Sequence, residues 1–375
     1  MLFRSMLTGS ELRVFRKSLL VWFREFQRDL PWRRDKDAYR VWLSEIMLQQ
    51  TRVAAVIPYY ERFLARFPTV EALAEAPTEE VLRLWAGLGY YSRARNLQRA
   101  AQQIVAKHAG QFPKNEGDVR ALPGIGAYTA AAILSIAFDQ EHAVLDGNVA
   151  RVLARLFAMR GDLREGARWQ ELQRSADALL ERSATADWNQ AVMELGATIC
   201  TPRAPQCLIC PVMKHCAARK EGAQEEIPDK RKKRAPLSVT LAAAVFVDGK
   251  SRTLLLAPPR LGTEKITAEH VPTLVSKMWH FPTIAVVKDA REEIERHVRR
   301  EFALEKNRPL SFVELARVRH SVTYRQIRVF GFRIVVAKLP RFAGAKAVAL
   351  DDLASVPISN LTRKIARVAL GVAAT

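Results

Sequence analysis

The sequence predicts a two-domain protein in which an all-α domain precedes a smaller α+β domain. Three observations support this fold class: residues 11–198 are dominated by helical periodicity, a charged stretch follows at 217–236, and patterns typical of β-strands begin after it. The chain has 375 residues, of which 49% are hydrophobic. That is enough to form two packed cores, which excludes a mainly disordered protein.

Each predicted helix is a stretch with an apolar face, bounded by turns that contain Pro, Gly or Asp. The first has apolar residues at helical spacing, including Phe15, Leu19 and Phe23. We expect helices near residues 11–28, 38–50, 52–66, 78–86, 92–108, 116–121, 127–138, 147–158, 167–182 and 187–198.

The composition changes abruptly after the last cysteine. We therefore divide the chain into a helical domain at 1–216, a basic linker at 217–236, and an α+β domain with a C-terminal tail at 237–375. The linker ends in the run DKRKKRAP, which either stays solvated or contacts phosphates. In the last domain we expect strands at 238–247, 252–257, 283–287, 312–318 and 327–336, and helices near 289–302 and 360–370.

The charge balance indicates a polyanionic partner. Lys and Arg number 59 against 39 Asp and Glu, which gives a net charge of +20. Such an excess is typical of proteins that bind nucleic acid. A basic protein without a nucleic-acid role is the competing interpretation.

The apolar runs are too short for a membrane span. The longest, 130–138 and 241–247, fall far below the ~18 to 20 residues that a span needs. The N-terminal residues lack the apolar segment and cleavage site of a secretory signal. We therefore expect no membrane partner and a reducing compartment, the cytoplasm of a bacterium, where the protein would associate with the nucleoid.

The four cysteines are the most specific signal in the chain. Cys200, Cys207, Cys210 and Cys216 have the spacing C-x6-C-x2-C-x5-C within one short loop. This clustering favours a metal site over disulfides. Four thiolates match the ligands of one 4Fe-4S cluster, with structural zinc and unligated cysteines as alternatives.

A glycine-containing turn connects two of the predicted helices. In Leu122–Thr129, Gly124 and Gly126 permit a tight turn whose amide groups can approach a phosphate, while the following helix presents its positive end. Asp146 follows twenty residues after Gly126 and could simply cap the helix that begins near Asn148.

The hairpin, the aspartate and the cysteine loop together resemble the helix-hairpin-helix DNA glycosylase superfamily with an iron-sulfur loop. Further motifs are similar to the MutY-type adenine DNA glycosylases, which remove adenine mispaired with 8-oxoguanine. This similarity is dense across 11–216 and is carried by the motifs at 30–33 (LPWR), 41–51 (VWLSEIMLQQT), 84–95 (LWAGLGYYSRAR) and 188–196 (WNQAVMELG).

The resemblance implies a two-carboxylate reaction. Adenine is a poor leaving group unless its ring is protonated, and Glu45, kept protonated by apolar neighbours, would act as the general acid at N7. Asp146 would stabilise the oxocarbenium-like sugar, and Asn148 and Tyr128 would orient Asp146 or the sugar. Related enzymes with lyase activity carry a lysine near the position of Tyr128, so the resemblance implies a monofunctional glycosylase.

The resemblance also assigns binding residues. It places Arg28, Trp32 and Gln190 in the adenine pocket. It places Gln50, Thr51, Leu88 and Tyr90, with Leu122, Gly124 and Gly126 of the hairpin, at the DNA. The implied partner is double-stranded DNA with adenine opposite 8-oxoguanine or guanine, bound by a monomer.

The C-terminal domain resembles, more weakly, the Nudix-like domain that adenine glycosylases use to recognise 8-oxoguanine. Its anchor is the motif Met-Trp-His-Phe-Pro at 278–282. The carboxylate pattern of a hydrolytic Nudix site is not met, so we expect no nucleotide hydrolysis. Family members often carry Phe-Ser-His in the lesion-reading loop, where this chain has Val322, Thr323 and Tyr324. Thr323 and Tyr324 are therefore the candidate lesion contacts, and the departure predicts different contacts or weaker discrimination.

The leading hypothesis is a monofunctional adenine DNA glycosylase of base excision repair. One alternative is a glycosylase similar to endonuclease III, with lyase activity on oxidised pyrimidines. The other is a lesion-binding protein without catalysis.

Overall fold

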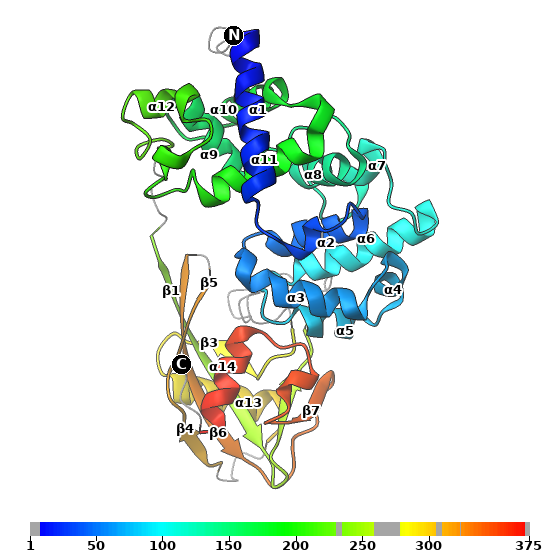
Figure 1. The fold of residues 1–375 in the computed structure, drawn as a ribbon. Coiled ribbons are helices and arrows are strands. Elements are labelled where there is room, and N and C mark those ends of the chain that lie inside the picture. Colours follow the sequence, from blue (N-terminus) through cyan, green and yellow to red (C-terminus); the bar gives the residue numbers. More distant parts are fainter. Residues whose placement is uncertain (1–7, 230–234, 259–277, 305–309, 323, 372–375) are drawn as a thin grey trace. The chain divides into compact units, whose positions relative to one another are not determined.

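The computed structural model describes residues 8–229, 235–258, 278–304, 310–322 and 324–371. The chain packs as two compact units (Figure 1). Met1–Ala76 and Asn96–Lys232 form the first, here the helical unit. Pro77–Arg95 and Lys233–Thr375 form the second, here the mixed unit.

The helical unit confirms the predicted all-α character. Its helices are α1 (Gly9–Phe26), α2 (Ala38–Leu48), α3 (Val53–Arg66), α4 (Val70–Glu75), α7 (Glu116–Ala121), α8 (Ala127–Phe138), α9 (Gly147–Leu156), α10 (Gly166–Leu179), α11 (Thr185–Thr198) and α12 (Ala217–Lys220), with α6 (Ser92–His108) beginning at its border. The sequence analysis did not predict α4, a six-residue helix capped by Thr69.

Helix α2 lies at the centre of this unit. It packs against α8 and α3, while α11 packs against α1, α8 and α9. Every residue of α2 from Val41 to Met47 is buried, and Trp42, Leu43 and Met47 are 0% exposed. A helical stretch that is buried on all sides belongs inside a core. A polar side chain within Val41–Met47 is therefore held in a low-dielectric environment.

The hairpin between α7 and α8 has the conformation that its glycines permit. Gly124 has a φ of +84°, and a Cβ there would lie 2.9 Å from the Cβ of Asn96. Gly126 caps α8 with an ordinary φ of −95°, and a Cβ there would meet nothing within 4 Å. Gly124 is thus required by the fold, whereas Gly126 leaves an open approach to the start of α8.

The mixed unit contains a five-stranded sheet with helices on both faces. The main sheet has the order β3 (Thr283–Ala285), β1 (Leu237–Val247), β6 (Arg325–Val335), β4 (Phe312–Glu314), and β5 (Val318–Val322) also pairs with β6. β1 and β6 run parallel, and the other pairs in this sheet are antiparallel. A separate ladder joins β2 (Arg252–Leu256) to β7 (Ala345–Ala349).

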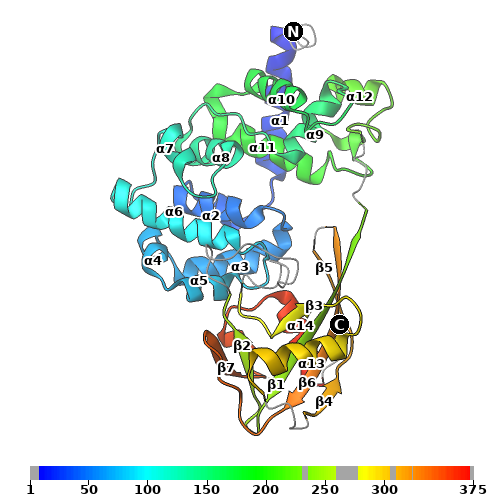
Figure 2. The ribbon, with the colours of Figure 1, turned by 180° about the vertical axis from the view of Figure 1, so that it is seen from behind.

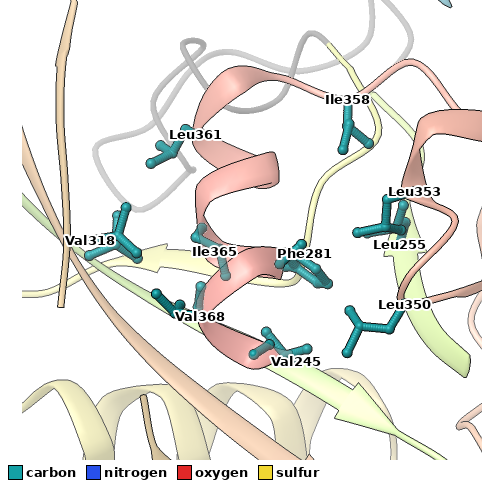
Figure 3. Close-up of a cluster of buried hydrophobic side chains, with 14 of the residues drawn as sticks. Val245, Leu255, Phe281, Val318, Leu350, Leu353, Ile358, Leu361, Ile365 and Val368 are labelled. Atoms are coloured by element: carbon teal, nitrogen blue, oxygen red, sulfur yellow. The ribbon is translucent and has the colours of Figure 1, made fainter. Parts of the chain in front are cut away.

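The two faces of the sheet have separate cores. Val245 and its alternate neighbours face α14 (Asn360–Ala369), where Ile365 and Phe281 pack against them (Figure 3). Phe246 and its alternate neighbours face α13 (Ala290–Glu301), which lies over the opposite face (Figure 2). The strict alternation along β1 confirms the α+β prediction for this region.

Two strands were not predicted from the sequence. Residues 312–318 were expected to form one strand, but β4 ends at Glu314 and β5 begins at Val318. β7 was missed because its sequence, AKAVA, has a single buried residue, Val348, and therefore shows no alternation.

The charged stretch at 217–236 is not a free linker along its whole length. Ala223 and Ile227 are 4% and 1% exposed, and the Ile227 carbonyl accepts a 2.8 Å hydrogen bond from Arg155 Nε. Apolar residues spaced among the charges anchor this part to the helical unit. A second departure from the predicted boundaries is that Pro77–Arg95, with α5 (Thr78–Trp85), groups with the mixed unit.

None of the helices that the structure describes is long and apolar enough to cross a membrane.

The two hairpin glycines should respond differently to alanine. Gly124→Ala should lower the free energy of unfolding by about 1–3 kcal/mol, because it forces a side chain into the left-handed region and against Asn96. Gly126→Ala should change it by less than about 1 kcal/mol. Urea unfolding of both variants measures the difference, and equal values would contradict the turn geometry.

Candidate active site

One cavity of about 550 Å³ opens into the helical unit, lined by residues of α2, α8 and α11 and by the start of α9. It brings together residues that lie more than 160 positions apart in the sequence. The predicted site residues that line it are Arg28, Trp32, Glu45, Gln50, Thr51, Tyr128, Asp146, Asn148 and Gln190.

Glu45 projects from the buried helix α2 into this cavity. Its side chain accepts a 2.8 Å hydrogen bond from the Tyr128 hydroxyl at Oε2. Burial raises the pKa of Glu45 to about 7; the bond from Tyr128 acts to lower it and the nearby Asp146 carboxylate acts to raise it. A large fraction of Glu45 is therefore protonated at neutral pH, as a general acid requires.

Asp146 caps α9 and lines the cavity at the same time. Its Oδ1 accepts hydrogen bonds from the backbone N–H groups of Asn148, at 2.9 Å, and Val149, at 2.7 Å. Burial raises the pKa of Asp146, although these bonds act to lower it. The capping interpretation and the catalytic interpretation are therefore compatible, because the cap holds one carboxylate oxygen and leaves the other directed to the site.

The second oxygen of Asp146 is oriented by Asn148. Asn148 Nδ2 donates to Asp146 Oδ2 at 3.1 Å, and its Oδ1 accepts from Arg151 Nη2 at 2.9 Å. Arg151 also donates through Nε to the Cys200 carbonyl at 2.8 Å. Gly196 of α11 allows this close packing, since a Cβ there would lie 2.8 Å from that of Asn148. The amide of Asn148 thus has one defined orientation.

Tyr128 is the second residue of α8, close after the hairpin. Besides its bond to Glu45, its hydroxyl lies 3.4 Å from Met193 Sδ. Burial raises the pKa of Tyr128 well above its ordinary value, so the hydroxyl remains a donor. Within the described part of the chain, no lysine lines this cavity.

The sequence analysis missed Glu194 and Arg33, which also line the cavity. Glu194 is 1% exposed and accepts from Arg28 Nε at 2.6 Å, Arg28 Nη2 at 2.7 Å and Arg33 Nη2 at 2.8 Å. Burial acts to raise the pKa of Glu194, but the two guanidinium groups lower it. A glutamate inside the apolar stretch Trp188–Gly196 was the available signal, since a buried carboxylate requires such partners.

The other predicted cavity residues take different positions. Trp32 is 7% exposed and packs edge-on against Tyr60, with ring centroids 5.4 Å apart. Gln190 donates to the Ala186 carbonyl of its own helix at 3.4 Å. Gln50 is exposed with a φ of +58°, and Thr51 follows it at the rim.

The predicted DNA-contacting residues outside the cavity differ in exposure. In the mixed unit, Tyr90 is 43% exposed with a φ of +47°, whereas Leu88 is 7% exposed. In the hairpin, Gly124 and Gly126 are exposed. The side chain of Leu122 is 2% exposed and packs in the core. Its N–H donates to the Val119 carbonyl, and its carbonyl accepts from the Ile125 N–H in the turn.

Of the two candidate lesion contacts, the structure describes one. Tyr324 lies at the turn between β5 and β6, where the Arg325 guanidinium lies 4.8 Å from the centre of its ring. Thr323 lies outside the described residues.

The four cysteines line a second, smaller cavity of about 30 Å³ together with Arg155, Arg219 and Gln224. Arg155 Nη1 donates to Cys200 Sγ at 3.3 Å. Burial raises the pKa of Cys210 to about 12, so its thiolate needs a compensating cation. No three His, Cys, Asp or Glu residues in the described ranges are arranged around a single metal ion.

Comparison with known proteins identifies the family. Residues 43–177 match the family model of HhH-GPD superfamily base excision DNA repair proteins. The chain is 48% identical over 227 residues to the human adenine DNA glycosylase, which spans 58% of this chain and 42% of the human protein. The region of similarity therefore covers less than half the length of the human protein.

Two further relatives extend this similarity. The adenine DNA glycosylase of Buchnera aphidicola subsp. Baizongia pistaciae is 39% identical over 253 residues, which cover 67% of this chain and 72% of that protein. Among solved structures, a thermostable thymine-DNA glycosylase is 29% identical with a TM-score of 0.52, over 57% of this chain and 98% of that one. From the identity, the coverage and the shared helical fold, the chain belongs to the adenine DNA glycosylase family of the HhH-GPD superfamily.

Proposed function

We propose that this protein is a monofunctional adenine DNA glycosylase of base excision repair. It would hydrolyse the N-glycosidic bond of adenine mispaired with 8-oxoguanine or guanine in duplex DNA. The observation that carries this proposal is one cavity in which a carboxyl with a pKa raised to about 7, Glu45, shares the lining with a hydrogen-bonded carboxylate, Asp146.

Glu45 supplies the proton. Its carboxyl, half protonated near neutral pH, would transfer a proton to N7 of adenine and so convert the base into a better leaving group. The Tyr128 hydroxyl fixes the carboxyl at Oε2 and stabilises the carboxylate left after proton transfer. After the base leaves, Glu45 takes up a proton again, because burial favours its protonated form in the empty site.

Asp146 stabilises the positive charge that develops on the sugar as the glycosidic bond breaks. Two backbone N–H groups and the Asn148 amide keep the carboxylate in place, so little reorganisation is needed in the transition state. Water then completes the hydrolysis. The division of labour follows the two-carboxylate logic of glycoside hydrolysis.

A glycosylase without lyase activity is supported by the cavity lining. A lyase needs an amine nucleophile that forms a Schiff base with the sugar. Tyr128 occupies the hairpin position in question, and lysine is absent from the described cavity lining. This favours the monofunctional reaction over the alternative similar to endonuclease III.

The cavity and the charge suit an extruded base. A glycosylase must take its target out of the duplex into a pocket, and a cavity of about 550 Å³ has room for a purine. The Arg28 guanidinium, held by Glu194, and the Trp32 ring would contact the adenine. The open N-terminus of α8 at Gly126 would bind a backbone phosphate, and the net charge of +20 would add salt-sensitive affinity.

Recognition of 8-oxoguanine is assigned to the mixed unit. We infer that this α+β unit is the Nudix-like domain of the family, with Tyr324 at the β5–β6 turn near the lesion. The Arg325 guanidinium lies over the Tyr324 ring and would hold this ring in place for stacking on a base. Thr323 would supply a hydroxyl beside it. The duplex would be bound by a monomer, in the cytoplasm of a bacterium.

We further infer that Cys200, Cys207, Cys210 and Cys216 hold one 4Fe-4S cluster. All four thiols line one cavity, each iron of such a cluster takes one thiolate, and Arg155 already donates to Cys200 Sγ. Zinc fits less well, because its common pattern uses two close C-x2-C pairs and here only Cys207 and Cys210 are that close. When bound, the cluster would neutralise the buried thiolates and tie their loop to α9.

The first test is adenine excision under single-turnover conditions by the wild type and Glu45→Gln. The substrates are duplexes with adenine opposite 8-oxoguanine, guanine or thymine. Wild type should release adenine from the first two, with strand scission only after alkali. Glu45→Gln should lose at least about 100-fold in rate, because amides cannot protonate the base.

Stability measurements exclude unfolding as the cause of that loss. The folded-state pKa of Glu45 lies above its ordinary value of 4.5, so wild-type stability decreases as the pH rises from 4.5 to about 7. Glu45→Gln should therefore be more stable than wild type above pH 7, by up to about 3 kcal/mol. Tight lesion binding without adenine release by the wild type would favour the binding-protein alternative, and scission without alkali would favour the lyase.

The pH dependence of excision should be bell-shaped. The rate should fall above about pH 7, where Glu45 loses its proton, and fall again in acid, where Asp146 gains one. Tyr128→Phe removes the hydrogen bond that lowers the Glu45 pKa, so its alkaline limb should move to higher pH. Single-turnover rates across the pH range in which the protein stays folded measure both limbs. An alkaline limb that stays in place in Tyr128→Phe would refute the assignment of Glu45 as the acid.

A further inference from the structure

One buried polar group beside the cysteines has no part in the proposed chemistry. Gln224 lines the cavity that the four thiols share. Its Oε1 atom is shielded from solvent and has no hydrogen-bond partner among the described residues. A buried amide oxygen without a donor costs about 1–3 kcal/mol, so its retention needs a reason.

The surroundings of this amide offer hydrogen-bond acceptors. The cavity brings Cys200, Cys207, Cys210 and Cys216 together, and as ligands all four would be thiolates, which accept hydrogen bonds. A side-chain donor at hydrogen-bond distance is Arg155, 3.3 Å from Cys200 Sγ, and backbone N–H groups bond to Cys210 and Cys216. The four thiolates would repel the side-chain oxygen of Gln224 and would attract an N–H.

A half-turn of the carboxamide resolves the conflict. Exchanging Oε1 and Nε2 moves no other atom, and the two atoms are distinguished only by their hydrogen bonds. Only the oxygen is both buried and unpartnered in the present orientation. The exchange would place an N–H in the buried position and leave the oxygen where the nitrogen now lies.

We propose that Gln224 donates a hydrogen bond from its amide to the sulfur of the iron-sulfur cluster, and that it stabilises the cluster and raises its reduction potential. Hydrogen bonds to cluster sulfurs offset the negative charge of the reduced state, which is why they raise the potential. Together with Arg155 it would form a pair of donors inside the cavity. The inference rests on the proposed cluster, and not on the excision reaction.

The test compares the wild-type holoprotein with Gln224→Met and Gln224→Glu. Met keeps the length of the side chain and removes the donor, while Glu keeps the shape and adds an acceptor. Gln206→Met, at an exposed glutamine of the cysteine loop, is the matched control. The readouts are the reduction potential, the rate of cluster loss to a chelator, and the shift of the Fe–S vibrations between H2O and D2O.

The potential should fall in Gln224→Met and fall further in Gln224→Glu. Cluster loss in Gln224→Met should accelerate by about 2- to 10-fold, the range for one net hydrogen bond, and the D2O shift should decrease. Gln206→Met should match wild type. Unchanged potential and D2O shift in both Gln224 variants would overturn the inference.

Two results separate this inference from the proposals on which it rests. Wild-type protein that contains no iron and sulfide would overturn the cluster assignment and the inference with it. Wild-type protein that holds the cluster and shows the Gln224 effects, but excises no adenine, would overturn the proposed function and support the inference.

Discussion

The burial of the Glu45 carboxyl within α2 is the constraint on which the site depends. The stretch from Val41 to Met47 is buried, so the ionised form of Glu45 is disfavoured and its pKa is raised to about 7. Burial of Glu45 lowers the stability of the protein at neutral pH, and it keeps a large fraction of this carboxyl protonated. An exposed glutamate with the same neighbours in sequence would be ionised and could not act as an acid.

Several residues in the helical unit have a structural role as well as a role in the proposed chemistry. Asp146 satisfies two N–H groups at the start of α9 and presents its other oxygen, oriented by Asn148, to the cavity. Arg151 then links Asn148 to the Cys200 carbonyl. The orientation of the carboxylate and the position of the cysteine loop are therefore coupled through a single helix, α9.

The ion pairs of Glu194 give the cavity a rigid wall. Arg28 and Arg33 both donate to this nearly inaccessible carboxylate, and a buried charge with two such partners cannot leave without a large penalty. The guanidinium of Arg28 is thereby fixed where the resemblance placed an adenine contact. The resemblance assigns Arg28 to the adenine pocket without explaining its position. The ion pair with Glu194 explains it.

The sequence by itself determined the helices, the hairpin and the change to an α+β unit, because periodicity and turn residues are local properties. It also selected Glu45, Asp146 and the four cysteines as candidate site residues through their motifs. The helix α4 and the strand β7 were missed, and in β7 a single buried residue gives no alternation to detect. Only the tertiary structure decided that residues from five helices share one cavity, that Glu194 pairs with two arginines, and that Pro77–Arg95 packs with the C-terminal residues. Burial and long-range contact set these features, since both depend on segments that only folding brings together.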